Sequence, residues 1–187
     1  MDLHDIIATI CPVPEASMKR LTACASRLEY PRGHHVLRAG KVERDLFFIE
    51  KGIARAYVVR EEKEITFWIG KEGDTVVSLK SYVKGEPGYE NIVLMEDSVL
   101  YCLRQEDLYR LYEEDIHIAN WGRKFAEQEF LQTEEKLIPL LFTTASYRYE
   151  ILLKNNPDLL QRIPLECLAS YLGITPVSLS RIRAKLR

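Results

Sequence analysis

The chain has 187 residues, of which 47% are apolar and 29% are charged, and its formal net charge is −2. This composition is typical of a folded globular protein and excludes an intrinsically disordered chain. No apolar run approaches the roughly 20 residues that a membrane span needs, and the acidic start of the chain lacks the basic residues of a signal peptide. We therefore expect a cytoplasmic protein built as one large or two small domains.

The first part of the chain predicts two short helices followed by a β-structure. The helices are expected over residues 2–10 and 15–28, separated by Pro12 and Pro14. From Tyr30 to Leu103, short apolar runs recur at a spacing of roughly 8–12 residues, and most are separated by turn signals that contain glycine. The runs lie at residues 36–37, 46–49, 53–59, 65–69, 75–79, 91–94 and 99–103. This pattern predicts a small antiparallel barrel or roll.

After Arg104 the pattern becomes helical, with a short helix expected over 106–113 and a long one over 115–141. The long helix carries two offset apolar stripes, one made of Ile118, Trp121 and Phe125, the other of Ala126, Phe130, Thr133, Leu137, Leu140 and Leu141. Two stripes need two partners, so we expect one to pack on the roll and the other to pair with the same helix of a second chain. The alternative is a helix that lies wholly in the core of its own chain.

The end of the chain differs in charge from the rest. Residues 142–187 hold seven basic and three acidic residues, whereas residues 1–141 have a net charge of −6. Thr143 or Thr144 is suited to cap a helix that ends before Pro157, and a short helical turn is expected over 158–163. A basic end on an acidic body is typical of nucleic-acid binding, although a solvated basic helix has the same composition.

Residues 163–187 have the pattern of a helix-turn-helix. Gly173 supplies the positive φ that the turn between two crossing helices needs, and Ala169 is small where the helices would touch. Thr175 followed by Pro176 is typical of an N-cap and the first residue of a helix. Apolar residues are spaced to face inward: Leu168, Leu172, Ile174, Leu179, Ile182 and Leu186. The alternative is a plain helical hairpin with a basic face.

The second helix of this pair has an outer surface suited to DNA. A recognition helix contacts base edges with its N-terminal residues. Ser178 can bond several bases, Val177 can pack on a thymine methyl group, and Arg181 is long enough for a bidentate contact with guanine. The phosphate candidates are Arg183, Lys185 and Arg187.

On these residues the chain resembles the Crp/Fnr family of bacterial transcription regulators. The run "IPLECLASYLGITPVSLSRIR" is similar to the helix-turn-helix of members from the Bacteroidetes lineage, and "YPRGHHVLRAGKVERDLFFIEKGIARAYVV" with the later "KEGD" resembles the start of the family's cyclic-nucleotide-binding-like β-roll. The resemblance runs from about residue 15 to 187. Its match on the recognition helix implies DNA contacts for Thr175, Val177, Ser178, Ser180 and Arg181.

The resemblance implies an α+β fold in three parts. An antiparallel β-roll sensor (a double-stranded β-helix, jelly-roll-like) would occupy residues 1–112, a dimerisation helix 113–141 and a helix-turn-helix DNA-binding domain 142–187. The implied partners are double-stranded DNA and a second copy of the chain, with RNA polymerase as a further candidate. The implied function is a dimeric regulator on a pseudo-palindromic operator.

The nucleotide pocket departs from the family pattern. Members that bind cyclic AMP have a Gly-Glu pair soon after the Gly-Asp turn, then an Arg-Ser/Thr pair that holds the cyclic phosphate. Here Gly73-Asp74 is present, but Val77-Ser78 stands in the Gly-Glu place and no arginine occurs between residues 75 and 103. Without an arginine fork a phosphate loses its strongest hydrogen bonds, so we expect cyclic AMP not to be the ligand and no cofactor to be bound. If a pocket persists, its candidate lining is Ser78, Tyr82, Tyr89 and Asn91.

Two other residue groups were weighed as sites. His34, His35 and Glu43 suggest a cupin-like β-roll metal enzyme with a helical appendage, which is the alternative function. Adjacent histidines on a strand point to opposite faces, so we expect neither a metal site nor catalytic residues. Cys11, Cys24 and Cys102 lack the clustering that an iron–sulfur centre needs and are expected to be inert thiols. The sequence thus predicts a DNA-binding regulator and not an enzyme.

Overall fold

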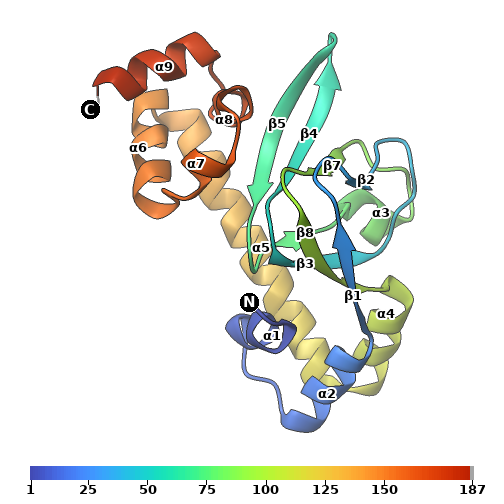
Figure 1. The fold of residues 1–187 in the computed structure, drawn as a ribbon. Helices are drawn as coiled ribbons and strands as arrows, with labels where there is room; N and C mark the ends of the chain where they lie inside the picture. The colour runs from blue at the N-terminus through green and yellow to red at the C-terminus, as the bar shows by residue number, and fades with distance from the viewer. Residues whose placement is uncertain (186–187) are drawn as a thin grey trace.

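The computed structural model describes residues 1–185, so the predicted core position of Leu186 and the predicted phosphate contact of Arg187 lie outside the described residues. The fold is α+β, with two antiparallel sheets between helices at the two ends of the chain (Figure 1). The strands are β1 (Ala25–Tyr30), β2 (His35–Leu37), β3 (Leu46–Lys51), β4 (Ala54–Arg60), β5 (Lys63–Gly70), β6 (Thr75–Val76), β7 (Asn91–Leu94) and β8 (Ser98–Leu103). The helices before and after the sheets are α1 (Leu3–Ile10), α2 (Glu15–Ala23), α4 (Gln105–Glu114), α5 (Ile116–Phe142), α6 (Ala145–Asn155), α7 (Leu159–Arg162), α8 (Leu165–Tyr171) and α9 (Pro176–Lys185), with α3 (Leu79–Lys84) inserted between β6 and β7.

The two sheets form a β-roll. One has the strand order β1-β8-β3-β6 and the other β2-β7-β4-β5, with antiparallel pairing throughout. Because side chains alternate along a strand, Phe47 and Ile49 of β3 face the core between the sheets, where they meet Ala56 and Ile92 of the other sheet. Leu46 and Phe48 belong instead to a second core. Strand β3 is therefore buried on both faces, which explains its unbroken apolar run.

This second core is built by helices on the outside of the roll. α1, α2, α4 and the first half of α5 pack there around Phe48 and Trp121, and the indole Nε1 of Trp121 donates to the carbonyl of Ile7 at 3.1 Å. Asp115 caps α5 by accepting from the N–H of His117 at 2.9 Å, and it also accepts from the hydroxyl of Ser17. These contacts fix the start of α5 against the N-terminal helices.

Helix α5 spans the molecule, with α1, α2 and α4 at one end and α6 to α9 at the other (Figure 1). The predicted stripe of Ile118, Trp121 and Phe125 packs into the second core, as expected. The other stripe is uncovered in the single chain: Phe130 is 75% exposed, and Leu137 and Leu141 are exposed too. None of the helices among residues 1–185 is both long enough and apolar enough to cross a membrane.

Two predicted elements are wrong. The helix expected over 15–28 ends at Ala23, and residues 25–30 form β1, which pairs with β8 along its whole length. The strand expected over 75–79 ends at Val76, and α3 begins at Leu79 and ends at Lys84, where it is capped by Gly85 with a φ of +66°. In the first place, pairing with β8 outweighs a local pattern that suits either structure. In the second, only Phe47 and Phe48 of β3 pair with β6, so the strand stops after Val76.

Candidate nucleic-acid interface

Helices α6 to α9 form one packed group, which we call the C-terminal unit (residues 145–185). Its core contains Tyr149, Leu152, Leu168, Leu172 and Leu179, all buried. Two residues of the β-roll, Ile53 and Ile69, belong to the same apolar cluster. The C-terminal unit therefore packs directly on the roll of its own chain.

The turn between α8 and α9 has the local chemistry that the sequence predicts. Gly173 has a φ of +69°, a left-handed conformation that favours glycine. The N–H of Ile174 donates to the carbonyl of Ala169 at 2.9 Å, and Ala169 is fully buried where the helices meet. Thr175 caps α9, because its Oγ1 accepts from the N–H of Ser178 at 3.1 Å. The turn is thereby held by its own backbone and cap.

Helix α9 is sorted into a buried and an exposed side. Leu179 is fully buried and Ile182 is half-buried against the same core. The opposite side, which we call the outer face of α9, is exposed and consists of Thr175, Val177, Ser180, Arg181, Ala184 and Lys185. Of the predicted contact residues among 1–185, this face includes all except Ser178 and Arg183, which are half-buried. The Ser178 hydroxyl lies 3.0 Å from the Oγ1 of Thr175, so it also takes part in the cap.

Arg148 of α6 joins three helices. Its guanidinium donates to the carbonyl of Thr143 at 2.6 Å, just after α5, and to the carbonyl of Leu172 at 2.7 Å, just after α8. The last carbonyls of a helix lack partners within the helix and carry its negative dipole end, so an arginine is a favourable donor there. Arg148 thus connects the end of α5 to the turn before α9.

A second arginine connects the C-terminal unit to the roll. Arg162 of α7 donates to Glu72 at 2.7 and 3.1 Å, and it also forms hydrogen bonds to Glu96, the one from Nε being 3.3 Å long. We call this group the Arg162 clamp (Arg162, Glu72 and Glu96). Burial alone would raise the pKa of the Glu72 carboxyl, but hydrogen bonds from Arg162 and from the N–H of Gly52 lower it to about 2. The pKa of Arg162 is raised by the same two glutamates.

The four candidate pocket residues have different surroundings in the structure. Tyr82 borders a surface hollow of about 400 Å³ together with Arg44, Lys84 and Tyr109. The other three lie apart from that hollow: the Ser78 side chain is buried, the Tyr89 ring is exposed beside Phe67, and the Asn91 amide accepts from the N–H of Ala39.

The candidate metal residues of the roll have separate partners. His34 stacks on Tyr30, the His35 Nε2 lies 3.1 Å from the hydroxyl of Tyr57, and Glu43 accepts from the N–H of Arg38. The four cysteines are free, and burial raises the pKa of the Cys102 thiol to about 11, which disfavours the reactive thiolate. These observations agree with the expectation of an unreactive Cys102.

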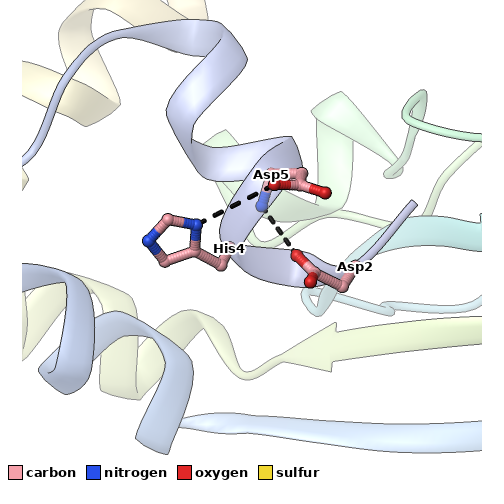
Figure 2. Close-up of side chains that lie close together, drawn as sticks. All are labelled: Asp2, His4 and Asp5. Carbon is pink, nitrogen blue, oxygen red and sulfur yellow. Dashed lines mark hydrogen bonds and ion pairs between the residues drawn. The ribbon is translucent and has the colours of Figure 1, made fainter.

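Figure 2 shows the one cluster of three metal-ligating side chains found among residues 1–185, which is Asp2, His4 and Asp5 at the start of α1. All three are exposed. Asp2 accepts from the N–H of Asp5 at 2.8 Å and is the N-cap of α1. Helix capping thus accounts for the position of Asp2.

The sequence predicts no particular role for Arg148 or Arg162 beyond their share in the basic end of the chain. Beside the near partners Thr143 and Asp158, Arg148 donates to a carbonyl 24 residues away and Arg162 to acidic residues 66 and 90 positions away. No local spacing marks such a contact, so the sequence carried no signal for it.

Comparison with known proteins identifies the roll. Residues 27–115 match the family model of the cyclic nucleotide-binding domain. Comparison with curated protein sequences gives no match.

Solved structures extend the likeness to the rest of the chain. FixK2 from Bradyrhizobium japonicum is 17% identical, with a TM-score of 0.73 over 87% of this chain and 84% of that one. The c-di-GMP responsive global regulator CLP from Xanthomonas campestris is 18% identical, with a TM-score of 0.71 over 92% and 91%. The Thermus thermophilus catabolite activator protein is 20% identical, with a TM-score of 0.57 over 92% and 83%. Residues 27–115 therefore match the cyclic nucleotide-binding domain family, and the chain shares its fold with these three solved structures.

Proposed function

We propose that this protein is a DNA-binding transcription regulator and acts by binding rather than by catalysis. The observation that carries the proposal is the outer face of α9. It presents small, polar and basic side chains on a helix whose opposite side is anchored by buried Leu179. Val177 is an apolar residue of this face, yet it is 62% exposed in the part of the chain that the structure describes. A major groove accepts a helix of this kind, with its first residues on the bases.

The same proposal includes a twofold dimer formed through α5. The exposed stripe of Phe130, Leu137 and Leu141 lies along one side of the helix, and the neighbouring Phe142 is 80% exposed. Covering this stripe with the same stripe of a second chain would bury apolar surface that water now contacts. A dimer would place two α9 helices about one DNA turn, roughly 34 Å, apart on a pseudo-palindromic site.

For the sensor we propose that cyclic AMP is not the ligand. The supporting observation is chemical: the segment from β6 to β8 offers lysines but no arginine. A lysine supplies a point charge without the paired donors that hold a phosphate in one orientation.

The test begins with selection of bound DNA from a random pool by the purified protein. Affinity for the selected site and for its single-base variants is then measured at several salt concentrations. We expect Arg181→Ala to relax specificity at one base position in each half-site, at a cost of roughly 1–3 kcal/mol. Lys185→Ala should weaken binding to all sequences alike and lower the salt slope by about one.

Arg123→Ala is the matched control, because Arg123 is an exposed arginine of α5 that pairs only with nearby Glu127 among the described residues. It should change neither specificity nor affinity. If the wild type selects no sequence, or if Arg181→Ala loses affinity equally for every base variant, Arg181 does not contact bases and the proposed DNA contact is wrong.

A further inference from the structure

The C-terminal unit lies beside β5, at the edge of the sheet β2-β7-β4-β5, with α8 against that strand (Figure 1). β5 is an edge strand, so some of its backbone N–H groups have no strand partner. The N–H of Thr66 donates instead to the Oγ of Ser170 in α8, at 2.8 Å, and that hydroxyl donates to the carbonyl of Glu64 at 3.3 Å. One serine of the C-terminal unit therefore takes the place of a neighbouring strand at this point.

The charged contacts lie at the other end of the same interface. Glu72 is in the turn after β5 and Glu96 is in the turn before β8, so the Arg162 clamp reaches two separate turns of the roll. Beside it, Lys71 forms an ion pair with Asp158 at 3.4 Å. All these partners are side chains, and each is partly open to water.

The two arginines of the C-terminal unit thus differ in kind. Arg148 holds backbone carbonyls at the ends of α5 and α8, and it makes no hydrogen bond to the roll among the described residues. Arg162 pairs with Asp158 of its own unit at 3.6 Å, but its hydrogen bonds go to Glu72 and Glu96 of the roll, and these are lost if the unit moves away from the roll. Along the chain the unit is joined to α5 only through the short Thr143–Thr144 connection. The clamp therefore restricts rotation about that connection.

We propose that Arg162 is a positioning residue: through Glu72 and Glu96 it fixes the direction of α9 relative to the β-roll, and so the spacing of the two α9 helices in a dimer. This inference rests on the proposed function. The Glu72 carboxylate also accepts from the N–H of Gly52 at 2.9 Å, which fixes it on the roll as an acceptor for Arg162.

The first experiment measures docking without DNA. Because the Thr66 N–H is bonded to Ser170 of the C-terminal unit, its hydrogen exchange reports directly on whether the unit is docked. We expect Arg162→Ala to speed exchange at Thr66 at least about tenfold. The N–H of Ile174, bonded within the unit to Ala169, should keep its protection and so demonstrate that the unit is still folded. Arg162→Lys, which keeps the charge but not the fork, should give an intermediate rate.

Arg27→Ala is the matched control. Arg27 forms the same kind of group, with Glu50 at 2.7 and 3.2 Å and Glu29 at 2.7 Å, but wholly within the roll. Its removal should leave Thr66 exchange unchanged. Unchanged exchange in Arg162→Ala would overturn the proposal, as would equal acceleration in both variants.

The second experiment measures half-site spacing. Wild type, Arg162→Ala and Arg27→Ala are compared on DNA with the selected half-sites moved apart or together by a few base pairs, and on a single half-site. We expect Arg162→Ala to keep its affinity for a single half-site. Its preference for the natural spacing over altered spacings should fall about tenfold, because two freely oriented units lose more conformational entropy when both bind one DNA molecule. Faster Thr66 exchange with an unchanged spacing preference overturns the positioning role. If the wild type binds no specific DNA, the proposed function fails, and the exchange measurement still decides whether Arg162 docks the unit.

Discussion

Replacing Glu72 by glutamine removes one charge of the Arg162 clamp while keeping its shape. The pKa of Glu72 is about 2 in the folded chain against an ordinary 4.5, which corresponds to at most about 3 kcal/mol of folding free energy. The side chains of Glu72 and Arg162 are 30% and 27% exposed, so water and salt weaken the interaction. We expect Glu72→Gln to cost about 1–2 kcal/mol at pH 7.

The sign of the pH dependence follows from the lowered pKa. A carboxylate whose pKa is depressed on folding stabilises the fold above its ordinary pKa, and this contribution is lost as the pH falls toward the folded value. The difference between wild type and Glu72→Gln should therefore be constant above about pH 5 and fall to less than half of its value by about pH 3.

Urea denaturation at a series of pH values measures this difference. Glu15→Gln is the control, because the side chain of Glu15 is 82% exposed and, within residues 1–185, pairs only with Lys19. It should be close to neutral at every pH. A cost for Glu72→Gln that is the same at pH 3 and pH 7, or that is no larger than the control, would refute the ion pair as a source of stability.

Three further predictions concern the dimer, the ligand and the turn. Phe130→Ser combined with Leu141→Ser should convert a dimer of twice 21.7 kDa into a monomer in sedimentation, whereas Val83→Ser, at a residue of α3 that is 68% exposed, should not; a wild type that is monomeric at tens of micromolar contradicts the dimer. Calorimetry with millimolar cyclic AMP should give no saturable heat, and micromolar affinity would mean that lysines or backbone amides replace the missing arginine. Gly173→Ala should lower the unfolding free energy by about 1 kcal/mol, because a side chain is unfavourable at a positive φ. An unchanged midpoint of urea unfolding would contradict this prediction.

The α8–α9 pair and much of the roll were predicted from the sequence because their chemistry is local. Gly173 and the Thr175-Pro176 start of α9 act on their own backbone, and the apolar spacing marks the buried side of each helix. The same holds for the inner stripe of α5, whose Ile118 and Trp121 are fully buried as expected. The same spacing predicts which residues of α9 are exposed, because the residues of a short helix that do not face the core face the solvent.

The remaining features were decided by tertiary structure. Residues 25–30 suit a helix or a strand by themselves, and pairing with β8 makes them a strand. The candidate pocket residues lie close together in the sequence, but their side chains have different neighbours in the structure. Arg162 meets Glu72 and Glu96 only because the C-terminal unit packs on the roll. The periodicity of a sequence does not predict a contact between residues that far apart. Such a contact depends on how two folded parts pack together and not on the conformation of either segment.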